Sequence, residues 1–275
     1  MSRSYVIGNS WQIRQLTHAE RAALDEEPWV FACNLFPSNW RMAGFRPSVW
    51  VMGDTETAEC QSLLRKELDA IRSDDHFRQR LKHIFICAES PEAREIVEKS
   101  GLPITLYRRG HSLQEGQQLA REISEQVYHH ISTLTDLVNF AWILNPQEEV
   151  RLYGCQYLTG PGHFYSPEYN LRDRLLTRLP RFCHELLDHR FCGFTTLLWQ
   201  ALADLRRQGV DLIDSNRAHG HRLPIDCQLP RKPFIDGVST SNLDILSPGW
   251  GHFGIAWRIR RRLLQVRDGC LRRKS

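Results

Sequence analysis

Five short apolar runs constrain the fold of this chain more than any other feature. Each run ends at a small or polar residue, and together they cover residues 4–10, 29–34, 49–54, 150–157 and 209–216. Apolar runs of this length without alternation are typical of strands that are buried on both faces. Such strands occur in parallel sheets that helices cover on both sides. The sequence therefore predicts a mainly parallel sheet.

The segments between these runs have helical or strand-like patterns, and the two kinds alternate along the chain. This alternation favours an α/β fold over separate helical and sheet regions. Ser132 and Thr133 stand where a helix is expected to begin, and their hydroxyls suit the capping of free backbone N–H groups. We expect helices over 56–73, 91–101, 113–130 and 132–145, and further strands over 83–90 and 104–109.

Length and composition indicate one globular domain with two additions. We expect a single domain over 1–256, with a lid-like insertion at 159–181 and a basic carboxyl-terminal extension at 257–275. No CxxC pair occurs among the eight cysteines, which favours reduced core thiols. The first ten residues are strand-like and unlike a signal peptide, and no apolar run reaches transmembrane length. These features predict a cytoplasmic protein.

Polar side chains follow the predicted strands at the points where the strands end. The carboxyl ends of parallel strands meet at one edge of the sheet, where ligands of such folds bind. The candidates at this edge are Asn9, Ser10, Asn34, Asp54, Gln156, Tyr157, Asp214, Ser215 and Asn216.

The order of these segments resembles a known family. GNS after the first strand, CNLF at 33–36, HIST at a helix start and VRLYGCQY occur in the order found in Rossmann-like bacterial sialyltransferases of the lipooligosaccharide type. Flagellin-glycosylating and pterin-diphosphokinase-like relatives of that family are similar as well. The resemblance covers residues 4 to 216 and implies a Rossmann-like, three-layer α/β fold.

The resemblance also implies contacts with a nucleotide-sugar donor. Gly8 and Asn9 match the turn that approaches the donor in the family, with Ser10 in place of its second glycine. Asn34 matches a donor-contacting asparagine, although Leu35 replaces the glutamine that follows it. Ser132 and Thr133 match the serine-bearing helix start, where Leu134 replaces a glycine and His130 an arginine.

The catalytic groups follow from the same resemblance. Tyr157 and Tyr165 are the nearest matches to two tyrosines that hold the leaving phosphate, and Gln156 replaces an aspartate beside them. The family's catalytic histidine precedes a helix that leads into the last strand. Both His189 and His184 fall in that region.

Elementary chemistry makes these roles intelligible. Transfer of a sugar needs a base for the acceptor hydroxyl, and histidine titrates near neutrality. The hydroxyls of Tyr157, Tyr165 and Ser132, together with a helix amino terminus, can stabilise the departing phosphate without a metal. The chain has no DxD motif, and Asp54 with Glu56 is the closest substitute for binding Mg²⁺ or Mn²⁺.

The carboxyl-terminal extension is rich in Lys and Arg and carries a single Asp. Ile259, Leu263, Leu264 and Val266 would form an apolar stripe on a basic helix, which is typical of binding to an anionic membrane surface. A solvated basic tail is the alternative. No recognisable nucleic-acid-binding motif is present, so nucleic acid is not an expected partner.

These observations together predict a metal-independent glycosyltransferase without a cofactor. It would transfer an acidic sugar such as sialic acid from a CMP-activated donor to a glycan or lipid-linked acceptor, and Asn9, Asn34, Ser132 and Tyr157 would surround one pocket. Two alternatives remain open. The chain could be a non-catalytic nucleotide- or glycan-binding protein, as the departures at Leu35, Leu134 and Gln156 indicate, or a pterin-diphosphokinase-like phosphotransferase.

Overall fold

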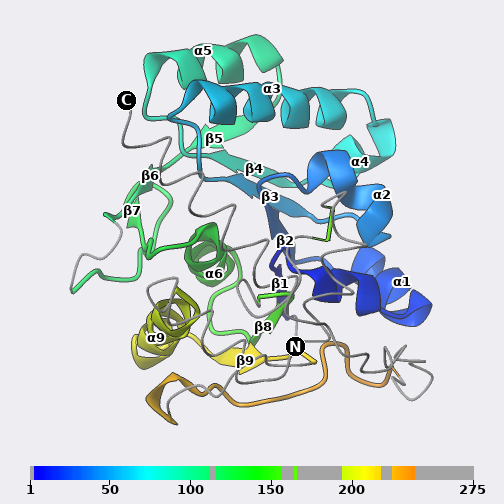
Figure 1. Cartoon of the computed structure of the whole chain (residues 1–275), viewed down its shortest axis with the longest axis vertical. Helices are drawn as coiled ribbons and strands as arrows, with labels where there is room; N and C mark the ends of the chain where they lie inside the picture. The colour runs from blue at the N-terminus through cyan, green and yellow to red at the C-terminus, as the bar shows by residue number, and fades with distance from the viewer. Residues whose placement is uncertain (1–2, 112–115, 156–163, 166–193, 218–224, 239–275) are drawn as a thin grey trace, which may run out of the picture.

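A seven-stranded parallel sheet forms the centre of the molecule (Figure 1). The computed structural model describes residues 3–111, 116–155, 164–165, 194–217 and 225–238. The strand order is β5-β4-β3-β2-β1-β8-β9, and every neighbouring pair is parallel. The strands are β1 (Ser4–Ile7), β2 (Val30–Cys33), β3 (Val49–Met52), β4 (His83–Ile86), β5 (Ile104–Leu106), β8 (Val150–Tyr153) and β9 (Leu212–Asp214). The predicted α/β fold is confirmed.

Helices cover both faces of the sheet and give three layers. One face carries η1 (Trp11–Gln15), α1 (His18–Glu26), η2 (Pro37–Asn39), α2 (Trp40–Ala43), α3 (Ala58–Arg72), α4 (Asp75–Arg80) and α5 (Pro91–Ser100). The other face carries α6 (Thr133–Leu144) and α9 (Phe194–Arg207). Successive strand residues point to opposite cores: Tyr5 and Ile7 face the first, and Val6 faces the second. Burial on both faces explains why the strands lack polar alternation.

Short capping sequences set where the helices begin. Thr17 and Glu20 form a capping box at the start of α1, and the Thr57 hydroxyl caps α3. Ser90 caps α5, which ends at Gly101 in the left-handed conformation that glycine adopts readily. The predicted helices at 56–73, 91–101 and 132–145 correspond to α3, α5 and α6.

The direction in which successive strands are added to the sheet reverses between β1 and β8. Strands β1 to β5 are added in sequence order on one side of β1, whereas β8 and β9 lie on its other side. The carboxyl ends of two such strands flank the position where α/β sheets bind ligands. Here the two loops approach closely, because a Cβ on Gly8 would lie 2.2 Å from the carbonyl oxygen of Gly154.

The predicted helix over 113–130 is wrong for the part that the structure describes. Residues 116–130 contain no helix, and β7 (Gln126–Val127) within them pairs with β6 (Arg108–Arg109) in a small parallel sheet. Asn139 of α6 is the physical reason. Its Oδ1 accepts hydrogen bonds from the N–H groups of Ala120 and Tyr128, so side chains replace helical carbonyls as the partners of this backbone.

The predicted strand over 104–109 is divided in the structure. β5 pairs with β4 in the main sheet, and β6 then leaves it to pair with β7. The buried Tyr107 lies between the two pieces. This division carries Arg109 away from the edge strand and toward the start of α6.

Two other expectations concern segments outside the described residues. The extension at 257–275 is one, and the insertion at 159–181 is the other except for Phe164 and Tyr165. In the part of the chain that the structure describes, no helix has both the length and the apolar character needed to span a bilayer.

Candidate functional site

Polar residues gather at the carboxyl edge of the sheet, as the sequence predicts, and hydrogen bonds link neighbouring strand ends. Asn9 follows β1, and its Nδ2 donates to the carbonyl oxygen of Cys33 at the end of β2 (3.2 Å). Asn34 follows β2, and its Oδ1 accepts from the N–H of Gly53 just after β3 (3.4 Å). The ends of three adjacent strands therefore form one continuous polar edge.

Asn9 has a buried side-chain oxygen without a hydrogen-bond partner among the described residues. The residue is only 1% exposed, and the atom concerned is Oδ1. A buried polar atom left without a partner costs about 1–3 kcal/mol, and such atoms are uncommon. The Asn9 Oδ1 is consequently suited to accept a hydrogen bond from a ligand.

Asn34 is held in a defined orientation. Its φ of 52° is in the left-handed region, which asparagine tolerates better than most residues. Its carbonyl oxygen accepts a hydrogen bond from the indole Nε1 of Trp50 (2.9 Å). With Oδ1 bonded to Gly53, the side-chain amide is oriented before any ligand arrives.

Gly8 and Ser10 have structural roles in this conformation. Gly8 donates its N–H to the carbonyl oxygen of Tyr153 (2.8 Å) and leaves no room for a side chain beside Gly154. The Ser10 hydroxyl accepts from the N–H of Gln12 and caps η1. Both residues shape the loop that presents Asn9.

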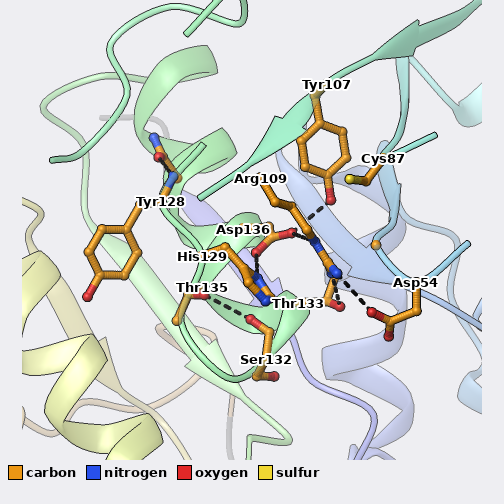
Figure 2. A network of polar contacts seen from close by, with 12 residues as sticks. Asp54, Cys87, Tyr107, Arg109, Tyr128, His129, Ser132, Thr133, Thr135 and Asp136 are labelled. Atoms are coloured by element: carbon orange, nitrogen blue, oxygen red, sulfur yellow. Dashed lines mark hydrogen bonds and ion pairs between the residues drawn. The ribbon is translucent and has the colours of Figure 1, made fainter. Parts of the chain in front are cut away.

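The start of α6 closes one side of the candidate site. The Ser132 hydroxyl accepts from the N–H of Leu134 (3.2 Å) and caps the helix, as expected. The Thr133 Oγ1 accepts a hydrogen bond from the Nη2 of Arg109 (2.8 Å). Figure 2 shows these residues converging on a charged network that the sequence did not predict.

Arg109 and Asp136 form the centre of this network (Figure 2). The Arg109 Nε donates to the Asp136 Oδ2 (2.8 Å), and its Nη1 donates to the Asp54 Oδ1 (2.8 Å). The Asp136 side chain is fully buried, whereas that of Asp54 is 60% exposed. Arg109 therefore joins an interior carboxylate to a carboxylate at the surface.

Two further groups donate to Asp136. The Tyr107 hydroxyl lies 2.7 Å from its Oδ2, and the His129 Nδ1 lies 2.6 Å from its Oδ1. An ionised carboxylate can only accept hydrogen bonds, so the proton belongs on Nδ1 of His129. The imidazole is thereby held against the Asp136 carboxylate (Figure 2).

Burial and charge set the protonation states around the network. Burial, together with the charge of Asp136, raises the pKa of Tyr107 well above its usual value, so the phenol remains a donor. Burial by itself would lower the pKa of Arg109, but Asp136, Tyr107 and Asp54 more than offset this, and the net pKa is raised. The guanidinium is therefore always charged.

The thiols near the site are not activated. Burial raises the pKa of Cys33 to about 12, and the charges of Asp136 and Asp54 contribute to this rise. Burial likewise raises the pKa of Cys87 to about 12. The thiolate is the nucleophilic form of cysteine, so neither residue is suited to covalent catalysis at neutral pH.

Tyr165 lies near the end of β1. The N–H of Phe164 donates to the carbonyl oxygen of Asn9 (3.0 Å), and the ring of Tyr165 packs edge-on against that of Phe164. The structure thus brings Asn9, Asn34, Asp54, Ser132, Thr133 and Tyr165 to the carboxyl edge. The other predicted site residues, Gln156, Tyr157, His184 and His189, lie outside the described residues.

The position of the histidines in the chain can still be compared with the fold. Helix α9 leads into β9, the last strand of the sheet. His184 and His189 precede α9 in the sequence. The helix and the final strand that the resemblance implies are therefore present, whereas the two histidines lie outside the described residues.

The residues that sequence analysis missed are Arg109, Tyr107, His129 and Asp136. One signal could have indicated them. Asp136 is the only charged residue in helix 133–144, and a buried charge requires a partner. The partner itself lies on β6 and could not be identified without the topology.

Asp54 and Glu56 are not part of any group of three potential metal ligands among the described residues. Asp54 accepts from Arg109, and Glu56 is exposed. No group of three or more His, Cys, Asp or Glu side chains in the described ranges could hold a metal ion.

A separate pocket of about 800 Å³ opens at the other end of α6. Trp142, Ile143 and Pro146 line it together with Gln208. Trp142, Ile143 and Pro146 lie near or beyond the carboxyl end of α6, whereas Ser132 and Thr133 stand at its start. The pocket is distinct from the polar edge and contains none of the predicted site residues.

Comparison with known proteins assigns this chain to no family. No protein-family model, curated protein or solved structure matches the chain.

Proposed function

We propose that this chain is a glycosyltransferase that binds a CMP-activated acidic sugar at the carboxyl edge of the sheet. The acceptor would be a glycan or a lipid-linked sugar. One observation carries the proposal: the ends of β1, β2 and β3 are hydrogen-bonded to one another beside β1 and β8, and the buried Asn9 Oδ1 there has no partner among the described residues.

The residues at this edge suit the two halves of a nucleotide. Asn9 and Asn34 offer amide groups to the ribose hydroxyls and the base. Ser132 and Thr133 stand at the amino terminus of α6, where the helix dipole amounts to about half a positive charge and favours a phosphate. The nucleoside would accordingly lie over β1 and β2, with its phosphate directed toward α6.

The proposed reaction is a single displacement. The acceptor hydroxyl attacks the anomeric carbon, the bond from that carbon to the phosphate oxygen breaks, and CMP departs with the bonding pair. A histidine, His189 or His184, takes the hydroxyl proton. The hydroxyl of Tyr165, with that of Tyr157, would donate to the leaving phosphate.

Isothermal titration distinguishes this proposal from its alternatives. CMP, UDP, GDP and ATP would each be titrated into the full chain, in EDTA and then in Mg²⁺. We expect CMP to bind in EDTA and more tightly than the other nucleotides. ATP binding that requires Mg²⁺ would favour a phosphotransferase, and CMP binding without sugar transfer from any CMP-sugar would favour a non-catalytic protein.

Two asparagine variants make the titration specific. Asn9→Leu removes the proposed acceptor, so CMP binding should weaken by about tenfold. Asn145→Leu is the matched control, because Asn145 is also buried but its Nδ2 bonds Ser4 at the opposite edge of the sheet. Equal effects of the two substitutions would contradict the proposed location.

The identity of the base is tested by activity. His189→Ala should lower kcat by roughly 100- to 10,000-fold, while CMP affinity changes little. Full activity of this variant would transfer the role to His184, and full activity of the double variant would exclude a histidine base from this segment.

Attachment to a membrane is a separate part of the proposal. The basic segment 257–275 would bind anionic headgroups and hold the enzyme near lipid-linked acceptors. Removing 257–275 should abolish sedimentation with phosphatidylserine vesicles but leave CMP binding intact. Neutral phosphatidylcholine vesicles are the control, and undiminished sedimentation of the truncated chain would contradict this role.

A further inference from the structure

We propose that Arg109 binds the phosphate of the nucleotide, and that the Asp54 carboxylate occupies this phosphate position until the ligand displaces it. The inference deepens the proposed function and rests on the nucleotide site placed there. It assigns a phosphate-binding role to a residue outside every sequence motif that predicted the site.

The position of Arg109 is the first argument. Its guanidinium lies across the end of β3, where a Cβ on residue 53 would be 1.5 Å from Nη2. The same group contacts Thr133 at the start of α6. Arg109 therefore fills the space between a strand end and a helix amino terminus, which is where the proposed phosphate would lie.

The unequal burial of its two carboxylate partners is the second argument. Asp136 is fully buried and also accepts from Tyr107 and His129, so it holds Arg109 permanently. The Asp54 side chain is 60% exposed, and among the described residues it is bonded to Arg109 alone. An exposed ion pair contributes little to stability, so Asp54 can be displaced at small cost.

Charge and donor geometry favour a phosphate as the replacement. Arg109 uses three of the five guanidinium N–H donors, one each to Asp136, Asp54 and Thr133. Departure of Asp54 leaves donors on both terminal nitrogens, which is the arrangement that binds phosphate oxygens in pairs. When the Asp54 carboxylate leaves Arg109, its negative charge leaves the network. The incoming phosphate replaces that charge, so Arg109 remains neutralised.

The direct test measures binding of inorganic phosphate, CMP and cytidine at low ionic strength. In Asp54→Asn the competing carboxylate is gone, so phosphate and CMP should bind about fivefold more tightly. Cytidine carries no phosphate, and its affinity should not change. Asp75→Asn is the matched control, because Asp75 is a similarly exposed aspartate that pairs with Arg78 on α4.

A second variant removes the proposed ligand-binding group. Arg109→Gln should weaken CMP binding by about tenfold and leave cytidine binding unchanged. If this variant does not fold, Asp54→Asn alone decides the matter. Unchanged or weaker phosphate and CMP binding in Asp54→Asn would overturn the inference, as would the absence of any phosphate binding by both the wild-type chain and this variant.

The same titrations separate this inference from the proposed function. If Asp54→Asn binds phosphate more tightly but CMP no better than UMP or GMP, the phosphate site holds and the CMP-sugar proposal fails. If CMP binds selectively but Asp54→Asn has no effect on it, the nucleotide site holds and the role of Arg109 is wrong.

Discussion

Two buried arginines in this molecule differ in what surrounds them. Arg151 lies in β8 with 1% of its side chain exposed, and Arg109 lies on β6 with 13% exposed. The Arg151 guanidinium bonds both oxygens of Asp236 and the carbonyl oxygens of Pro233 and Phe234. It therefore fastens one segment of chain to the sheet, with most of its donors engaged.

Arg109 has fewer partners, and they come from two places, helix α6 and the loop after β3. Its bonds go to Asp136, Thr133 and the exposed Asp54. Arg151 also has a half-exposed partner in Asp236, but two main-chain carbonyls bind it as well, and these cannot turn away. The kind of partner, more than burial, therefore separates an arginine that stabilises the fold from one that can bind a ligand.

The largest effect should come from Arg151→Met. Methionine removes the guanidinium that holds Glu149, Asp236 and two main-chain carbonyl oxygens together, so the free energy of unfolding should fall by about 3–5 kcal/mol. CMP affinity of the folded protein should not change. Urea unfolding measures the stability, and CMP titration measures the affinity. A loss of affinity without a loss of stability would show that Arg151 serves ligand binding and not the fold.

Asp136→Asn should have an intermediate effect on stability and a clear effect on binding. The amide retains an acceptor but leaves Arg109 with only Asp54 as a charged partner, which should cost about 2 kcal/mol. Arg109 would also lose its fixed orientation, so CMP should bind less tightly. An unaltered CMP affinity would show that the network serves the fold alone.

Gly53→Ala should affect stability least and phosphate binding strongly. The new Cβ would overlap the Arg109 Nη2 and displace the guanidinium, while the backbone of residue 53 requires no left-handed conformation. We expect a loss of about 1 kcal/mol in stability and about a tenfold loss in CMP affinity. In the Arg109→Gln background the same substitution should cause no further loss of affinity, and an additive loss would show that Gly53 acts independently.

The sheet could be predicted from the sequence because its strands are buried on both faces. Residues such as Tyr5 and Val6 face opposite cores, and this requirement leaves an apolar run that few other structures produce. The prediction of a helix over 113–130 was wrong because long-range contacts, and not the local pattern, decide the backbone conformation there. The local composition of this segment is helical, but Asn139 and Gln208 bind its backbone from distant elements.

The candidate site was predictable to a similar, partial degree. Polar residues after parallel strands must collect at one edge, so the proximity of Asn9, Asn34 and Asp54 follows from the fold class. The pairing of Asp54 with Arg109 does not follow, because it depends on the departure of β6 from the main sheet. Long-range pairing of this kind has no signature in local spacing.

A crystal structure of the full chain with CMP, grown in EDTA, would show directly whether the CMP phosphate replaces Asp54 on Arg109. We expect CMP at the carboxyl edge of the sheet, with its phosphate about 3 Å from the Arg109 guanidinium and Asp54 turned away. A hydrogen-bond donor of CMP should contact the Asn9 Oδ1. CMP in the pocket beside Trp142, or at the edge with the Arg109–Asp54 pair unbroken, would contradict this expectation.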